Sequence, residues 1–183
     1  MRKNMGMTRV RPALPTDSPA LREIEMLAGE AFRSIGMEEI ADGEPMSVEV
    51  LDRYALSGRS WVATDEPDWP VGYVVVDVAD RNAHVEQISV HPDYQGRGLG
   101  KGLLDTVRAW AIETGRPAIT LTTFVDVPWN CPLYEHLGFV VLSEHEVGPE
   151  LRAIQEHETQ MGLDPVTRVC MRKQIAHGVG EES

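Results

Sequence analysis

The sequence predicts a mixed α/β fold, in which a mostly antiparallel central sheet of about six to seven strands carries helices on both faces. Three observations predict it. Short β-prone runs with turn residues between them dominate the first half of the chain, as in antiparallel hairpins. Strands and helices alternate in the second half. Hydrophobic residues make up 42% of the 183 residues, which is enough for a sizeable core.

The N-terminal third predicts one strand and two helices. Residues 8–13 have the composition of a short strand. From 20 to 35 the apolar residues recur at helical spacing, and Gly36 is a suitable stop. After an acidic loop, Ser47 is placed to cap a short helix that runs through Leu56.

The middle of the chain predicts three strands, at 60–64, 71–79 and 83–90. The segment 65–70 between the first two is rich in Asp and Pro and predicts a turn. A glycine-rich turn follows the third strand and leads into a helix over 99–114, which Gly115 would cap.

The C-terminal part continues the alternation. The remaining elements that we expect are a strand at 118–123, a helix at 129–137 ended by Gly138, a strand at 139–142, a charged helix at 149–161 and a strand at 166–173. Nothing marks a domain boundary, so we expect one domain over 1–183, with a folded core at 7–175 and a frayed tail at 176–183.

Charge and cysteine content narrow the function classes. The formal net charge of −12 leaves no basic surplus for binding nucleic acid. The acidity either aids solubility or favours a cationic partner. Cys131 and Cys170 are far apart and in no metal-ligand spacing, which predicts neither a disulfide nor a metal site and fits a reducing compartment. The longest apolar stretch, 73–78, is too short to span a bilayer, so we expect a cytoplasmic protein without a membrane partner.

A glycine-rich segment between a strand and a helix carries the strongest chemical signal. Gln95-Gly96-Arg97-Gly98-Leu99-Gly100 lets backbone N–H groups converge at a helix N-terminus, which favours a phosphate or pyrophosphate site. The nucleoside-triphosphate loop does not match, because three rather than four residues separate Gly96 from Gly100. The dinucleotide fingerprint fails as well, because Leu103 stands where its last glycine belongs. A tight turn without a ligand is the structural alternative.

Two motifs together resemble a known family. Gln95-x-x-Gly98-x-Gly100, directly after Val90-His91-Pro92, resembles the acetyl-coenzyme A loop of the GNAT superfamily of N-acetyltransferases. Further on, Asn130-Cys131-Pro132-Leu133-Tyr134-Glu135-His136-Leu137-Gly138-Phe139 resembles that superfamily's second motif, an Asn followed by Tyr-x-x-x-Gly-Phe. The spacing from Asn130 to Tyr134 is shorter than in many members, and Pro132 lies within it. This departure affects the role of Asn130 more than that of Tyr134.

The resemblance implies an acetyl-coenzyme A-dependent N-acetyltransferase that needs no metal. The acetyl group would move to a primary amine of a small molecule or peptide by direct attack in a ternary complex. The alternative is a non-catalytic sensor or regulatory module that binds an acyl-coenzyme A. The resemblance assigns coenzyme binding to Gln95, Gly96, Arg97, Gly98, Leu99, Gly100 and Lys101, to the backbone of Ile88 and Val90, and to Asn130.

An amine acceptor requires a general base that removes a proton from its ammonium group. An amine with a pKa of about 10 is protonated at neutral pH, and only the neutral nitrogen attacks. Strand alternation places His84, Glu86, Ile88 and Val90 on one face, where apolar neighbours would raise the pKa of the Glu86 carboxylate. Glu86 is therefore the predicted base, with His84 or a water relay as alternatives. By resemblance, Tyr134 is the general acid toward the leaving thiolate; its alternative role is packing.

Other polar residues have plainer interpretations. We interpret His91, which precedes a proline, as a turn residue, and Cys131 as a packing residue. Asp126 and Trp129 either line the acceptor pocket or anchor a helix. Acidic residues at 38–44 either attract a cationic amine or form a solvated loop. The helical segment 148–163 either closes over the acceptor or contacts a second copy of the chain in a homodimer.

Overall fold

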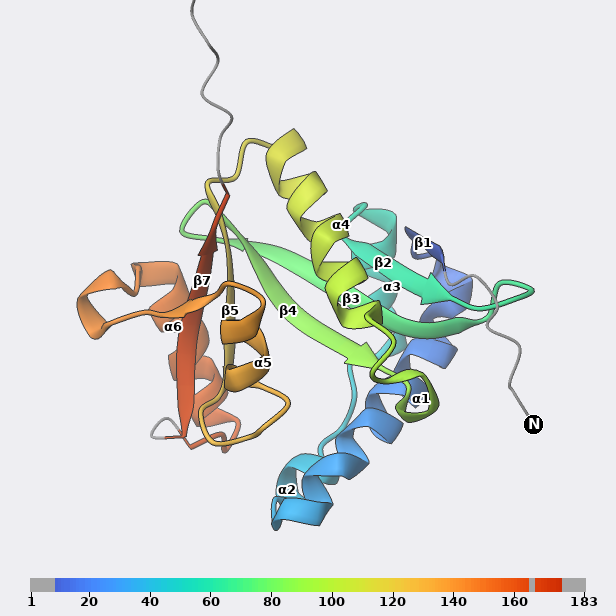
Figure 1. Ribbon diagram of the computed structural model, residues 1–183, viewed down its shortest axis with the longest axis horizontal. Helices are drawn as coiled ribbons and strands as arrows, with labels where there is room; N and C mark the ends of the chain where they lie inside the picture. The colour runs from blue at the N-terminus through green and yellow to red at the C-terminus, as the bar shows by residue number, and fades with distance from the viewer. Residues whose placement is uncertain (1–8, 165–166, 176–183) are drawn as a thin grey trace, which may run out of the picture. The chain divides into compact units, whose positions relative to one another are not determined.

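The computed structural model describes residues 9–164 and 167–175. Three expectations lie outside the described residues: the first strand's start at residue 8, the last strand's start at residue 166 and the frayed tail at 176–183. Among the described residues, seven strands form one sheet in the order β1-β2-β3-β4-β5-β7-β6. Figure 1 labels all of them except β6. Their bounds are β1 Arg9–Pro12, β2 Ser60–Thr64, β3 Pro70–Ala79, β4 Asn82–Val90, β5 Ala118–Phe124, β6 Val140–Val141 and β7 Arg168–Gln174.

The sheet is mixed and mostly antiparallel, as the sequence predicts. β1–β2, β2–β3, β5–β7 and β6–β7 pair antiparallel, whereas β4 and β5 pair parallel through Ala83↔Ile119 and His84↔Thr120. The α-helices are α1 Ser18–Gly29, α2 Glu38–Ala41, α3 Val48–Leu56, α4 Leu99–Glu113, α5 Cys131–His136 and α6 Pro149–Gln160. Short 3₁₀ turns occur at η1 Pro15–Asp17, η2 Glu30–Ile35, η3 Pro92–Tyr94 and η4 Glu144–Glu146.

Local capping signals place the helix ends where the sequence predicts them. Ser47 Oγ accepts a hydrogen bond of 3.3 Å from the Val50 amide at the start of α3. Gly36 and Gly115 adopt left-handed backbone angles, with φ of 76° and 68°. The helix expected over 20–35 is α-helical only as far as Gly29, and 3₁₀ beyond it. Glycine is among the weakest helix formers, and a Cβ at Gly29 would lie 3.8 Å from the carbonyl oxygen of Ala41 at the end of α2.

The chain divides into two compact units, Met1–Val76 with Glu86–Thr106 and Asp77–Val85 with Val107–Ser183. In the first unit, apolar side chains of α1 and α3 pack on one face of β2 and β3. This core contains Ala13, Leu21, Ile24, Leu51, Val62, Tyr73 and Val75. Burial of these side chains is the main stabilising contribution to this unit.

The start of α4 packs near the opposite face of β3. A Cβ at Gly72 would lie 3.1 Å from the carbonyl oxygen of Ser89 and 3.6 Å from Leu103 Cδ1. Gly72 and Tyr73 point to opposite faces because side chains alternate along a strand. The first unit therefore has helices on both faces of its strands, and glycine at 72 permits the close approach of α4.

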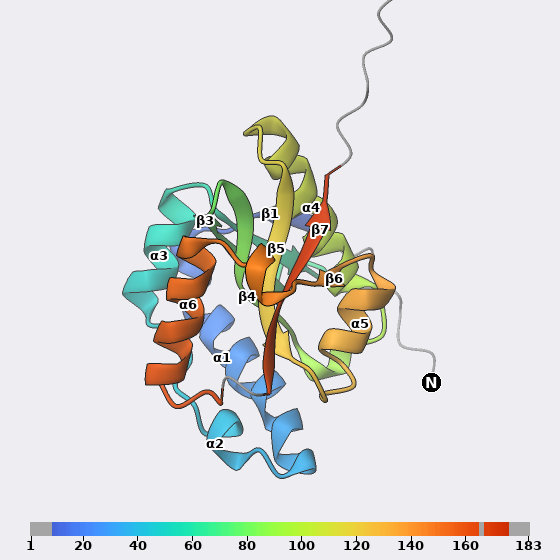
Figure 2. The same cartoon turned by 90° about the vertical axis from the view of Figure 1, so that its left-hand side faces the viewer.

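In the second unit, β5 and β7 pair along their whole length, from Ala118↔Gln174 to Phe124↔Arg168. α6 lies beside them (Figure 2). Its side chains Leu151 and Ile154 pack with Leu142 and Cys170. The turn between β3 and β4 fixes the start of α6.

Asp80 in this turn has a left-handed φ of 48°. Its carboxylate accepts hydrogen bonds of 3.0 Å from the amides of Glu150 and Leu151. The Asp80 amide in turn donates to the Glu150 side chain. Asp80 thus caps α6 across the fold, and a Cβ at Gly148 would lie 2.3 Å from its carboxylate.

Candidate active site

The loop between β4 and α4 has a backbone that glycine makes accessible. Gly96 and Gly98 adopt φ of 72° and 77°, in the left-handed region that other residues rarely adopt. A Cβ added at Gly96, Gly98, Gly100 or Gly102 would meet no heavy atom within 4 Å. The surface above these glycines is therefore open to a ligand.

The amide groups of this loop are available to an anion. Gln95 N donates to the carbonyl oxygen of Pro92 at 3.3 Å, and Gly102 N donates to that of Gly98 at 3.0 Å. Between them, six consecutive amides from Gly96 to Lys101 donate to no carbonyl oxygen within the described part of the chain. They lie at the N-terminus of α4, where the helix dipole adds positive potential. This is the geometry of a phosphate-binding loop.

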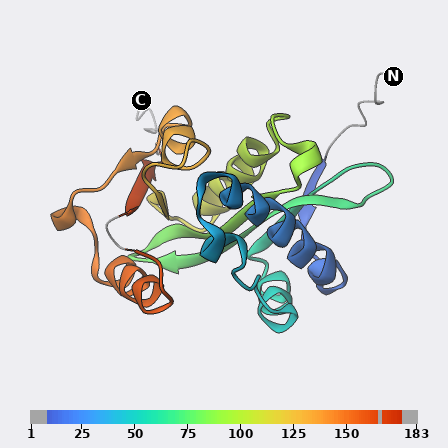
Figure 3. The same cartoon turned by 90° about the horizontal axis from the view of Figure 1, so that it is seen from below.

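Side chains fix the approach to the loop in ways that the sequence analysis missed. The Tyr94 hydroxyl donates to the carboxylate of Asp65. Asp65 lies in the loop that joins β2 to β3; Figure 3 shows this loop as the long green hairpin turn. This hydrogen bond raises the pKa of Tyr94 above its usual range. Arg97 stacks on the Tyr94 ring, with Cζ 4.7 Å from the centroid, and donates to the carbonyl oxygen of Asp93 at 2.8 Å. The hairpin, the 3₁₀ turn and the glycine loop are thereby held together.

The remaining predicted loop residues have weaker restraints. Gln95 Nε2 donates to the carbonyl oxygen of Val90 at 3.4 Å, so its side chain turns back to the strand end. Lys101 pairs with Asp105 at 2.6 Å, but both side chains are more than half exposed, and such a pair contributes little to stability. The Lys101 ammonium group can therefore exchange Asp105 for a phosphate at small cost. Leu99 is buried, which anchors the first turn of α4.

Strand β4 carries the predicted base. Gln87 Nε2 donates to Ser89 Oγ at 2.9 Å, so these side chains share one face, in agreement with the expected alternation. Glu86 is exposed, whereas Ile88 and Val90 are half-buried. The strand face on which the sequence predicts a shielded Glu86 carboxylate thus leaves this side chain exposed. The role of Glu86 stays a prediction.

Two histidines have roles that the structure makes clear. His91 Nδ1 accepts a hydrogen bond of 3.1 Å from the Asp93 amide, which confirms it as a turn residue. His84 belongs to the second unit and is 1% exposed, with Nδ1 at 3.1 Å from Thr120 Oγ1. Burial lowers the pKa of His84 to about 4, so the imidazole is neutral at pH 7.

The second motif forms α5. Asn130 stands at its N-cap, and Tyr134 N donates to the carbonyl oxygen of Asn130 at 3.0 Å. The Tyr134 ring meets Phe139 edge to face at 5.7 Å, and burial raises the pKa of its hydroxyl to about 12. Tyr134 is therefore protonated at neutral pH, as a proton donor must be. The catalytic role of Tyr134 stays a prediction.

Cys131 and the acidic loop offer little additional chemistry. Cys131 is buried, and burial raises the pKa of its thiol, which supports a packing role. Asp42 accepts a 2.6 Å hydrogen bond from Arg33, and this guanidinium lowers the pKa of Asp42. Among residues 9–164 and 167–175, no group of three or more His, Cys, Asp and Glu side chains is placed to hold a metal ion. Nor does any helix in these ranges have the length and apolarity to cross a membrane.

Residues 20–139 match the sequence model of the acetyltransferase (GNAT) family. The chain belongs to this family. The matched residues include strands β2 to β5, the glycine loop and the second motif, so the resemblance of the two motifs to GNAT sequences is confirmed.

Curated relatives match over parts of their length. An uncharacterized N-acetyltransferase of Methanocaldococcus jannaschii is 32% identical over 77 residues, which is 38% of this chain and 34% of that protein. The peptidyl-lysine N-acetyltransferase YjaB of Salmonella typhimurium is 25% identical over 99 residues, or 54% of this chain and 62% of that protein. The chain thus matches about a third to three fifths of their length.

A solved structure agrees in fold. The PaiA N-acetyltransferase of Thermoplasma acidophilum, in complex with coenzyme A, superposes with a TM-score of 0.64 at 16% identity. The superposition covers 92% of this chain and 99% of that one. At this identity the likeness shows the fold alone.

Proposed function

We propose that this GNAT protein is an N-acetyltransferase that takes its acetyl group from acetyl-coenzyme A. The observation that carries the proposal is the row of six amides, Gly96 to Lys101, exposed at the N-terminus of α4 in a chain of this family. These amides can donate hydrogen bonds to a pyrophosphate. Each charge-assisted hydrogen bond contributes about 1.5–3 kcal/mol to the binding free energy. The Thermoplasma acidophilum structure contains coenzyme A, in accordance with this proposal.

In the donor half of the site, Gln95 to Lys101 bind the pyrophosphate, and Arg97 adds charge at the rim. The backbone groups of Ile88 and Val90 bind the pantetheine arm, and Asn130 contributes a further polar contact. The Val90 N–H donates to the thioester oxygen, where negative charge grows as the acceptor nitrogen attacks. Acetyl-coenzyme A is thus a cosubstrate, and the reaction needs no covalent enzyme species.

The acceptor is a primary amine of a small molecule or a peptide, and the transfer is direct. Glu86 takes a proton from the ammonium group, which frees the nitrogen lone pair for attack on the thioester carbon. The carbon–sulfur bond breaks as the carbon–nitrogen bond forms. Tyr134 donates its proton to the leaving thiolate, and the proton that the amide nitrogen loses restores the neutral tyrosine. The name of the Salmonella relative, a peptidyl-lysine N-acetyltransferase, fits an amine acceptor of this kind.

An acceptor screen tests the proposal. The full-length protein is incubated with acetyl-coenzyme A and a panel of amines, amino acids and lysine peptides, and free thiol and acetylated product are followed together. We expect equal amounts of both with at least one acceptor. Coenzyme binding without turnover of any acceptor would favour the alternative of an acyl-coenzyme A sensor. Absence of coenzyme binding would exclude both.

A further inference from the structure

The sheet face next to α6 is polar within the second unit. Residues directly opposite each other in an antiparallel pair share a face, and β5 pairs with β7 as Thr120↔Arg172, Thr122↔Cys170 and Phe124↔Arg168. The face thus carries two threonines, two arginines, a cysteine and a phenylalanine. Polar side chains inside a fold cost free energy unless they are paired, and such clusters often mark binding sites.

Arg168 is held rigidly on this face. Its Nε donates to Glu158 Oε2 at 3.1 Å, and its Nη2 donates to Glu158 Oε1 at 3.0 Å and to Thr122 Oγ1 at 2.9 Å. The guanidinium stacks on Phe124, with Cζ 4.6 Å from the ring centroid. The Arg168 side chain is only 13% exposed, and that of Glu158 only 19%. A guanidinium held on two sides loses little entropy when it binds a further group.

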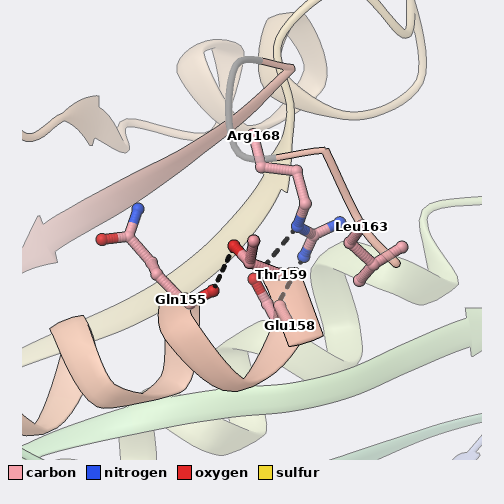
Figure 4. Close-up of a pocket in the computed structure, with 5 residues that line it drawn as sticks. All are labelled: Gln155, Glu158, Thr159, Leu163 and Arg168. Atoms are coloured by element: carbon pink, nitrogen blue, oxygen red, sulfur yellow. Dashed lines mark hydrogen bonds and ion pairs between the residues drawn. The ribbon is translucent and has the colours of Figure 1, made fainter. Parts of the chain in front are cut away.

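The third nitrogen of Arg168 adjoins a hollow. Gln155, Glu158, Thr159, Leu163 and Arg168 line it (Figure 4). Within the described part of the chain, Arg168 Nη1 makes no hydrogen bond, and Figure 4 shows it on the side of Leu163, away from Glu158. The enclosed part of the hollow has room for about one water-sized group. It therefore suits a single oxygen atom of an end group whose ligand lies outside the hollow.

The hollow lies at the end of β5 from which the chain leads to α5. Arg168 stands opposite Phe124, the last residue of β5, and the Val125 amide donates to the carbonyl oxygen of Thr167 at 2.8 Å. The segment after Val125 leads directly to Asn130 and Tyr134. The hollow and the proposed acid Tyr134 thus both lie at the carboxyl end of β5.

We infer that the acceptor amine also bears a carboxylate, and that Arg168 binds this carboxylate through Nη1. The inference rests on the proposed N-acetyltransferase function and names its substrate class, an amino acid or the C-terminal residue of a short peptide. Carboxylates are the planar anions that guanidinium groups bind best. Glu158 and Phe124 position the guanidinium, and the charge of Glu158 opposes a second carboxylate and so limits its affinity.

Binding of product analogues tests the carboxylate site without requiring turnover. N-acetyl amino acids with small, apolar, acidic and basic side chains, and N-acetyl dipeptides, are titrated calorimetrically against the protein with coenzyme A. Each is compared with the same compound whose C-terminal carboxylate is replaced by a neutral amide. We expect at least one carboxylate to bind about tenfold or more tightly than its amide, as one charge-assisted hydrogen bond provides. Equal binding throughout the panel, or no binding, overturns the inference.

Variants assign the preference to Arg168. Arg168→Gln should abolish the carboxylate-to-amide ratio, and Arg168→Lys should reduce it, whereas Glu158→Gln should increase it because a negative charge is removed. Arg172→Gln is the matched control, since Arg172 lies on the same face but pairs with Glu146 at 3.0 Å. A ratio measured within one variant is independent of the folded fraction.

The outcomes separate the inference from the proposed function. Retention of the ratio in Arg168→Gln, or its loss in Arg172→Gln as well, would contradict the assignment to Arg168. Acetyl transfer to amines with no preference for carboxylates would contradict the inference but not the proposed function. A carboxylate preference without acetyl transfer to any amine would contradict the proposed function, while the carboxylate site at Arg168 would still be supported.

Discussion

The variant Gly98→Ala tests the backbone conformation of the glycine loop without disturbing the packing of the chain. Gly98 has a φ of 77°, and a Cβ there would meet no heavy atom within 4 Å. Alanine in this conformation costs about 1–2 kcal/mol of strain but causes no clash within the protein. Gly58, in the turn between α3 and β2, has a φ of 69° and equally open surroundings. Gly58→Ala is therefore a control with the same strain outside the loop.

The two variants should differ in coenzyme affinity alone. Urea unfolding should show both losing about 1–2 kcal/mol. Calorimetric titration with acetyl-coenzyme A should show Gly58→Ala unchanged. Gly98→Ala should raise the Kd about 10- to 150-fold, which corresponds to the loss of one charge-assisted hydrogen bond of about 1.5–3 kcal/mol. If both variants bind the coenzyme as tightly as the unaltered protein, the loop is not its phosphate site.

Three further predictions concern the second unit. Tyr134→Phe should lower kcat about 100-fold or more while the Kd of acetyl-coenzyme A stays unchanged, because the ring remains and the proton donor is lost; an unaltered kcat would leave Tyr134 a packing residue. Burial lowers the pKa of His84 to about 4, so the unfolded chain binds an extra proton below about pH 6.5, and stability should fall by roughly 3 kcal/mol between pH 6.5 and 4. Urea unfolding across this range should show the slope reduced in His84→Gln and retained in the exposed control His136→Gln. Asp80→Ala should lower the free energy of unfolding by about 1–2 kcal/mol, since α6 loses two capping bonds, whereas Asp80→Asn should cost less; equal costs would show that charge-independent capping is not the cause.

Local sequence signals predicted the fold where the cause was local. Ser47 caps α3 through its hydroxyl, and Gly115 follows the end of α4 because it has no Cβ and adopts a positive φ. Both effects reach only a few residues along the chain. The helix expected at 129–137 begins only at Cys131, and the strand expected at 139–142 is reduced to Val140–Val141. The bounds of β6 depend on its pairing with β7, which the local pattern does not specify.

The candidate site was predictable in its backbone and less so in its side chains. The glycine spacing from Gly96 to Gly100 indicated a phosphate loop, and the loop has the positive φ angles and available amides that this requires. The contact of Tyr94 with Asp65 joins segments far apart in the sequence. The cluster of Arg168, Glu158 and Thr122 likewise depends on strand register and on the position of α6. No residue spacing in the sequence therefore predicts it.

The central claim, acetyl transfer from acetyl-coenzyme A to an amine, is tested most directly by mass spectrometry of the acceptor panel with thiol release recorded in the same reactions. The account predicts an N-acetylated product and an equal amount of free coenzyme A for at least one amine, and loss of both in Gly98→Ala at low coenzyme concentration but not in Gly58→Ala. Coenzyme binding with no acetylated product from any amine in the panel would contradict it.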